Sequence, residues 1–123
     1  KEQGTLRNNT IVSTVMCNLG FLKAMESLGI SVVQSQVGDR YVIQNMVAHE
    51  ANLGGEQSGH IIFSDYNTTG DGLVSALQVL NIMKETNLTL SELASVMKRY
   101  PQHLVSVPVR EKPDLNNLKL VQE

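Results

Sequence analysis

The sequence predicts an α/β domain of three layers, α/β/α, in which helices cover both faces of a mixed four-stranded sheet. Strand-like and helix-like segments alternate along the 123 residues, which is typical of this architecture. A chain of this length can bury a hydrophobic core without disulfides. Its hydrophobic fraction of 41% and charged fraction of 18% are those of a globular protein.

The first strand and helix are predicted from a β-branched run and a capping residue. Residues 11–16 favour a strand, and Asn18 can accept hydrogen bonds from the unpaired N–H groups of a helix that follows. Gly29 is expected to end this helix. The residues expected on its apolar face are Leu22, Met25 and Leu28.

A second strand and helix follow the same pattern. Residues 30–37 are predicted as a strand, and Asp39 is expected to cap the helix after Gly38. This helix is expected to fade near Ala51. Spacing places four residues on its inward face: Val42, Ile43, Met46 and Val47.

The second half of the chain predicts a hairpin, two helices and a final extended segment. The short spacing between Gly55 and His60 favours an antiparallel turn between two strands, the second at 60–63. Thr69 and Asp71 are expected to cap a long helix. Its apolar stripe is wide enough to cover a sheet and consists of Leu73, Ala76, Leu77, Leu80 and Met83.

Thr89 and Glu92 have the spacing of a capping box ahead of a further helix. Residues 104–109 alternate loosely, and Pro101 before them and Pro108 within them predict an edge strand or a linker there.

Composition excludes several classes of protein. A net charge of −2 gives no support to nucleic-acid binding. No apolar run approaches the length of a membrane span, so no membrane partner is expected. Cys17 is the only cysteine, which rules out an internal disulfide and favours a cytoplasmic location. The polar, methionine-free start and the polar end predict that the chain is a piece of a longer protein.

The polar loop between the two hairpin strands is the strongest candidate for a binding site. Five of the nine glycines lie between Gly54 and Gly72. They surround a carboxylate, a hydroxyl and an imidazole, on Glu56, Ser58 and His60, which are groups that can hydrogen-bond sugar hydroxyls. The alternative is an ordinary glycine-rich turn, with His60 as a strand-end histidine.

Sharper motifs are absent from this stretch. No lysine is present to complete a phosphate-binding P-loop. Asp65, Asn67 and Gly70 match a calcium-binding loop, but Ala76 occupies the position of its bidentate glutamate. No histidine or cysteine cluster has zinc-binding spacing.

Two neighbouring stretches, 54–63 and 65–72, resemble the third domain of the bacterial phosphoglucosamine mutases, a family of the α-D-phosphohexomutase superfamily. The most specific part is the G-E-x-S-G-H signature. Residues 14–20 and 37–42 support the resemblance, which runs from about residue 9 to residue 109.

The resemblance implies a role in substrate binding. Such enzymes have four domains around a cleft, interconvert glucosamine 6-phosphate and glucosamine 1-phosphate, and feed cell-wall precursor synthesis. His60 would lie near the reacting sugar and could assist proton transfer. The substrate-binding residues that the resemblance implies are Gly55, Glu56, Ser58, Gly59 and His60, with Asp39 and Arg40 in a second loop facing the cleft.

The resemblance also implies which parts lie elsewhere. The phosphoserine donor, the Mg²⁺ loop and the substrate-phosphate loop belong to other domains, and none of their motifs occurs here. This piece alone is therefore expected to be inactive and to bind no metal. Its expected partners are the phosphosugar and the other domains of the same chain. Residues 1–110 are expected to form the domain and residues 111–123 the start of a linker to the fourth domain. The alternative is a stand-alone α/β ligand-binding or regulatory module.

Overall fold

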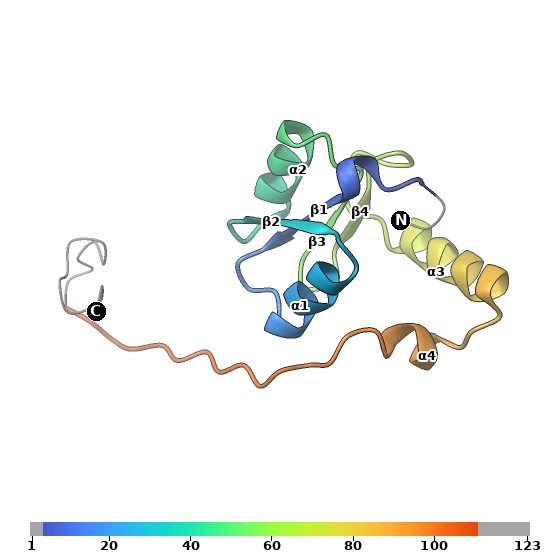
Figure 1. Ribbon diagram of the computed structural model, residues 1–123. Coiled ribbons are helices and arrows are strands. Elements are labelled where there is room, and N and C mark those ends of the chain that lie inside the picture. The colour runs from blue at the N-terminus through green and yellow to red at the C-terminus, as the bar shows by residue number, and fades with distance from the viewer. Residues whose placement is uncertain (1–3, 111–123) are drawn as a thin grey trace.

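The computed structural model describes residues 4–110 and has one four-stranded mixed sheet with helices on both faces (Figure 1). This confirms the predicted α/β class and the mixed sheet. The elements, in chain order, are η1 (Arg7–Asn9), β1 (Thr10–Thr14), α1 (Leu19–Ser27), β2 (Ser31–Ser35), α2 (Asp39–Ala48), β3 (Leu53–Gly55), β4 (Ile61–Phe63), α3 (Gly72–Thr86) and α4 (Leu90–Ala94).

The order of strands in the sheet is β2-β1-β3-β4. β1 pairs in parallel with both β2 and β3, and β4 runs antiparallel to β3, as the short hairpin spacing predicts. Because the carboxyl ends of parallel strands meet at one edge, the segment after β2 and the segment after β3 emerge at that same edge. The segment after β2 starts α2, and the segment after β3 is the polar loop. The topology therefore brings Asp39 and Glu56 to one edge of the sheet.

One face of the sheet packs against α2 and forms the core. Alternate strand residues point to this face, because side chains on a strand alternate between its two sides. The core residues are Val12, Val42, Met46, Ala51 and Ile62, with Val33 and Ile43 partly buried against them. Val42 is fully buried and Ile62 is only 2% exposed.

The other face of the sheet lies on the side of α1, and a cavity of about 620 Å³ opens over it. Ile11, Leu53 and Ile61 line the cavity from the strands, and Phe21 of α1 and Met97 line it from the sides. In Figure 1, α1 and α2 lie on opposite sides of the sheet. This face is thus less completely covered than the α2 face.

The predicted helix caps of α1, α3 and α4 are confirmed. The side chain of Asn18 accepts a hydrogen bond from the N–H of Gly20. Asp71 accepts from the N–H groups of Leu73 and Val74. Thr89 and Glu92 form a complete capping box at α4. Within residues 4–110, Thr69 makes no cap hydrogen bond, and Asp71 alone is the N-cap of α3.

Two predictions for α2 are wrong. The N-cap is Gly38, which has no side chain, and Asp39 is the first helical residue rather than the cap. The carboxylate of Asp39 is directed toward His60 instead. Val47, predicted to face inward, is 75% exposed, because the inward face of α2 is limited to Val42, Ile43 and Met46.

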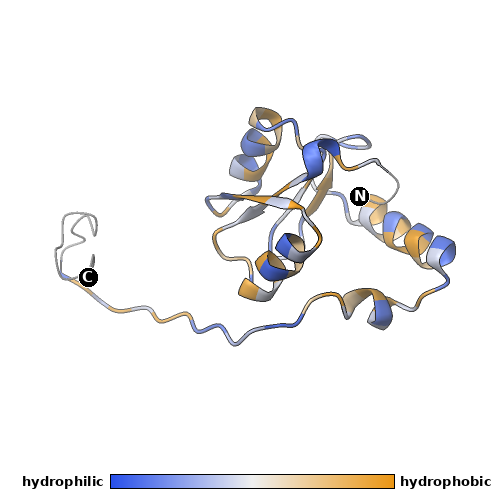
Figure 2. Ribbon diagram, viewed as in Figure 1, coloured by the Kyte–Doolittle hydropathy of each residue, from blue (hydrophilic) through white to orange (hydrophobic). Residues whose placement is uncertain are grey.

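The apolar stripe of α3 does not cover the sheet. Leu73 is 72% exposed and Leu77 is 56% exposed, because α3 approaches the sheet only beside β4 and then runs away from it (Figure 1). Figure 2 shows hydrophobic colour on this exposed helix. The half-buried side of α3 includes Val74 and Val79.

Residues 104–109 form no strand in the described part of the chain, and Leu104 is 79% exposed. The prediction of an edge strand over these residues is therefore wrong. The linker expected over 111–123 lies outside the described residues. Within residues 4–110, no helix is both long enough and apolar enough to cross a membrane.

Candidate functional site

The loop from Glu56 to His60 closes a tight hairpin between β3 and β4. The N–H of Glu56 donates to the carbonyl of His60 at 3.0 Å, and the N–H of Gly59 donates to the carbonyl of Glu56 at 3.0 Å. Gly59 has a φ of +100°, which L side chains rarely adopt. A Cβ on Gly55 would lie 2.8 Å from the carbonyl oxygen of His60. Both glycines are needed for the geometry of the turn.

The turn brings three predicted site residues together with a fourth from α2. The Nδ1 atom of His60 lies 3.2 Å from Oε1 of Glu56 and 3.4 Å from Oδ1 of Asp39. The Oγ atom of Ser58 is 3.4 Å from the same nitrogen. The Glu56 side chain is 10% exposed, whereas the His60 side chain is 60% exposed. The cluster thus has a covered carboxylate and an accessible imidazole.

The two carboxyl groups in this cluster change each other's pKa. A hydrogen bond with Glu56 raises the pKa of Asp39, and desolvation adds to the rise. The same hydrogen bond lowers the pKa of Glu56, and hydrogen bonds with His60 and Ser58 lower it further. Of the two carboxyl groups, Glu56 therefore loses its proton more readily, and Asp39 is the more basic.

Arg40 is not brought into the cluster, although the sequence placed it beside Asp39. Its guanidinium donates to the hydroxyl of Tyr41 at 3.2 Å and lies 4.9 Å from the centre of that ring. Among the described residues, none of the ion pairs of the cluster includes Arg40. The direction of this side chain gives no support to a contact between Arg40 and a sugar held at the loop.

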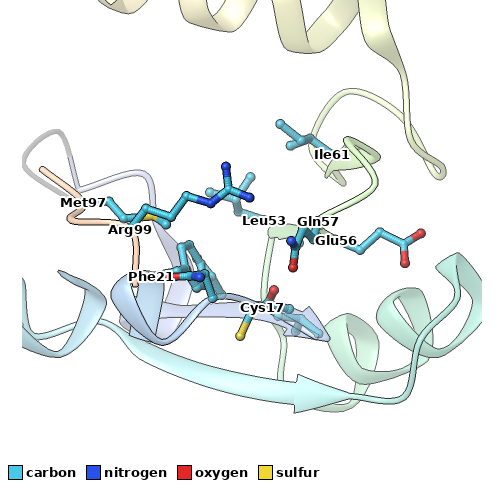
Figure 3. Close-up of a pocket in the computed structure, with 14 residues that line it drawn as sticks. Cys17, Phe21, Leu53, Glu56, Gln57, Ile61, Met97 and Arg99 are labelled. Atoms are coloured by element: carbon cyan, nitrogen blue, oxygen red, sulfur yellow. The ribbon is translucent and has the colours of Figure 1, made fainter. Parts of the chain in front are cut away.

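The cavity over the α1 face adjoins this cluster at Glu56. Glu56 and Gln57 line its edge, but most of its lining is apolar. In Figure 3 the side chain of Glu56 points away from Leu53 and Arg99, so its carboxylate is directed out of the cavity. Sugar hydroxyls need hydrogen-bond partners, so we place the candidate site at the cluster and not in the cavity.

Sequence reasoning missed Gln57 as a cavity residue and Arg99 as a charged group at its rim. Arg99 lies far along the chain from the loop, so no local spacing could have indicated it. Leu53 and Ile61 point to the opposite face of the sheet from Gly54 and Ile62, because neighbouring side chains on a strand alternate. This alternation is a sequence signal for an apolar surface on the cavity side.

A metal ion is the other ligand to consider at this cluster. The ligand atoms of Asp39, Glu56 and His60 lie within 4.8 Å of one another. Mg²⁺ prefers an all-oxygen set, so an imidazole among the donors does not fit it. The donor set of this cluster therefore does not fit Mg²⁺, and its three groups are instead within hydrogen-bond reach of one another.

Comparison with known proteins gives consistent matches. The family model described as phosphoglucomutase/phosphomannomutase, alpha/beta/alpha domain III, matches residues 1–100. A phosphoglucosamine mutase of Protochlamydia amoebophila is 61% identical over 99% of this chain and 27% of its own length. One from Chlamydia caviae is 60% identical over the whole chain and 27% of its own length. One from Anoxybacillus flavithermus is 64% identical over 92% of the chain and 25% of its own length. The chain thus spans about a quarter of the curated relatives that it matches.

Proposed function

The chain belongs to the phosphoglucomutase/phosphomannomutase domain III family, and we propose that it is the sugar-binding domain of a phosphoglucosamine mutase. In this proposal the full-length protein interconverts glucosamine 6-phosphate and glucosamine 1-phosphate. The names of its relatives, at about 60% identity across nearly the whole chain, support the choice of enzyme. The domain supplies the surface that holds the sugar ring, and the other domains of the same protein are its partners.

The observation that carries the proposal is the convergence of Glu56, Ser58 and His60 in one tight turn. A carboxylate accepts two or more hydrogen bonds, and a hydroxyl both donates and accepts, so together they can satisfy adjacent sugar hydroxyls. Charge-assisted hydrogen bonds from hydroxyls to Glu56 are stronger than neutral ones. The lowered pKa of Glu56 keeps this carboxylate ionised and favours such bonds.

In the proposed mechanism, this domain orients the sugar while phosphoryl transfer takes place elsewhere. Phosphoryl transfer depends mainly on positioning and on stabilising the developing charge. Glu56 and Ser58 contact the ring hydroxyls, and these contacts hold the reacting sugar oxygen in line with the phosphoryl group. The exposed imidazole of His60 can take up or return a proton beside the sugar.

The rest of the proposal concerns the full-length protein. A phosphoserine and a Mg²⁺ ion would both be held by residues outside this chain, where the serine would supply the phosphoryl group and the ion would neutralise its charge. We propose that the protein is cytoplasmic and that its product is used in the synthesis of peptidoglycan precursors. The present chain alone has no mutase activity, because it lacks the donor and the phosphate clamp.

Kinetics of the full-length protein test the proposal. Glu56→Ala should lower kcat/KM by about a hundredfold or more, because removing a charged hydrogen-bond partner costs on the order of 3 kcal/mol. Glu50→Gln, two residues beyond the C-terminal end of α2, is the matched control and should leave kcat/KM unchanged. Circular dichroism should show that both variants are folded. Unchanged turnover in Glu56→Ala would refute the sugar-binding role and favour a module in which the loop is only a turn.

A further inference from the structure

Three oxygen atoms converge on one ring nitrogen of His60. They belong to Glu56, Asp39 and Ser58 and lie 3.2, 3.4 and 3.4 Å from Nδ1. An ionised carboxylate can only accept hydrogen bonds, so the contact with Glu56 requires a hydrogen on Nδ1. Across residues 4–110, every hydrogen bond of the His60 ring is made by Nδ1. Nε2 is left without a partner in this part of the chain.

We propose that Asp39 and Glu56 hold neutral His60 in its Nδ1–H form, which leaves the lone pair of Nε2 as the ring's only acceptor for a hydroxyl of the bound sugar. Which nitrogen of a histidine carries the hydrogen is set by the bond that the other nitrogen makes. Asp39 is therefore a positioning residue, because it acts on the sugar only through Glu56 and His60.

Asp39 suits this role because it comes from a rigid element. It is the first residue of α2, which is anchored in the core by Val42 and Met46. Glu56 and His60 both belong to the loop, so a contact between them cannot fix the loop relative to the sheet. The contacts of Asp39 with His60 and with Glu56 join the loop to α2.

The groups around Asp39 also favour this assignment. The hydrogen bond between the two carboxyl groups raises the pKa of Asp39 and lowers that of Glu56, so Glu56 is the more readily ionised of the two and the better acceptor for Nδ1–H. Arg40, the nearest cation in sequence, is turned toward Tyr41 and does not compete for either carboxyl group.

The tautomer of His60 can be measured without substrate. In the full-length protein labelled with ¹⁵N-histidine, the ring signals of His60 are assigned by their loss in His60→Gln. We expect a protonated Nδ1 and an unprotonated Nε2 at a pH where the ring is neutral. Asp39→Asn should lower the Nδ1–H fraction, Asp39→Glu should restore most of it, and Glu50→Gln should leave it unchanged. An Nε2–H form in the unmodified protein, or no change in Asp39→Asn, would overturn the proposal.

A kinetic measurement adds the consequence for substrate, and only this part rests on the proposed function. Asp39→Asn should lower kcat on the order of tenfold to a hundredfold, by analogy with the loss when the orienting partner of a metal-bound histidine is removed, with KM changed less. Asp39→Glu should recover part of the loss. A changed tautomer with unchanged kcat would support the positioning role of Asp39 and refute the role of His60 at the sugar. An unchanged tautomer would overturn the inference and leave the sugar-binding role of Glu56 intact.

Discussion

Gly54 lies at the centre of the sheet, and an added methyl group there tests how tightly the core is packed. It pairs with Val12 of β1 on one side and with Ile62 of β4 on the other. A Cβ on Gly54 would lie 2.5 Å from Sδ of Met46 and 3.0 Å from both Cγ of Met46 and Cγ1 of Val42. The ordinary separation of such atoms is about 3.5–4.0 Å, so the sulfur must retreat by about 1 Å.

The cost of Gly54→Ala follows from two opposing effects. Overpacking a core costs about 1–3 kcal/mol, and Met46 is only 3% exposed, so little space is available for its side chain to move. Replacing a strand glycine by alanine gains about 0.5–1 kcal/mol in conformational entropy. Because the sulfur is at the flexible end of its side chain, we expect a net loss of about 1–2 kcal/mol in the free energy of unfolding.

Urea denaturation followed by circular dichroism measures this loss, and a double-mutant cycle assigns it to Met46. Met46→Ala alone should cost about 2–5 kcal/mol, but it removes the atoms that the new methyl group meets. The free energy of unfolding of the double variant should therefore exceed the value expected from adding the two single losses by about 1 kcal/mol or more. Gly72→Ala is the control, since no atom lies within 4 Å of its Cβ, and it should not destabilise the chain. Full stability in Gly54→Ala, or an additive cycle, would refute this view of the core.

Three further predictions concern helix caps and the isolated chain. Thr89→Ala should cost about 1 kcal/mol at the start of α4, seen as faster amide exchange at Glu92, because the hydroxyl accepts from that N–H at 3.3 Å; unchanged exchange would contradict it. Hydrogen bonds from the N–H of Val74 and from the Asn67 side chain lower the pKa of Asp71. The stabilisation from this cap should therefore be present above the unfolded pKa of about 4 and be lost as the pH falls through the lower folded value. A pH titration of the Val74 amide by NMR measures this, and an amide that does not respond to acid would be evidence against the cap. The 123-residue chain alone should show no mutase activity and no micromolar binding of glucosamine 6-phosphate by calorimetry, and a Kd in that range would mean that the chain holds a complete site.

Local signals predicted the parts of the fold that depend on neighbouring residues. The caps at Asn18 and Asp71 and the antiparallel turn between Gly55 and His60 each depend on residues within a few positions, and each is confirmed. The stripe of α3 was misassigned because periodicity shows that a helix has an apolar face but not what that face contacts. Leu77 belongs to this face and is more than half exposed.

The candidate site was predictable only in part, for the same reason. Glu56 and His60 lie in one turn, so sequence alone could place them together. Asp39 joins them because β1 lies between β2 and β3, and no spacing in the sequence encodes that order. Reading Asp39 as a helix cap was wrong because Gly38 takes that position, which frees the Asp39 carboxylate to face His60.

A crystal structure of the full-length protein with bound glucosamine 6-phosphate would test the central claim most directly. We expect ring hydroxyls within hydrogen-bond distance of the Glu56 carboxylate and the Ser58 hydroxyl, with Nε2 of His60 facing the sugar. A sugar bound in the cleft with no contact to the loop between Gly55 and His60 would contradict the proposed function.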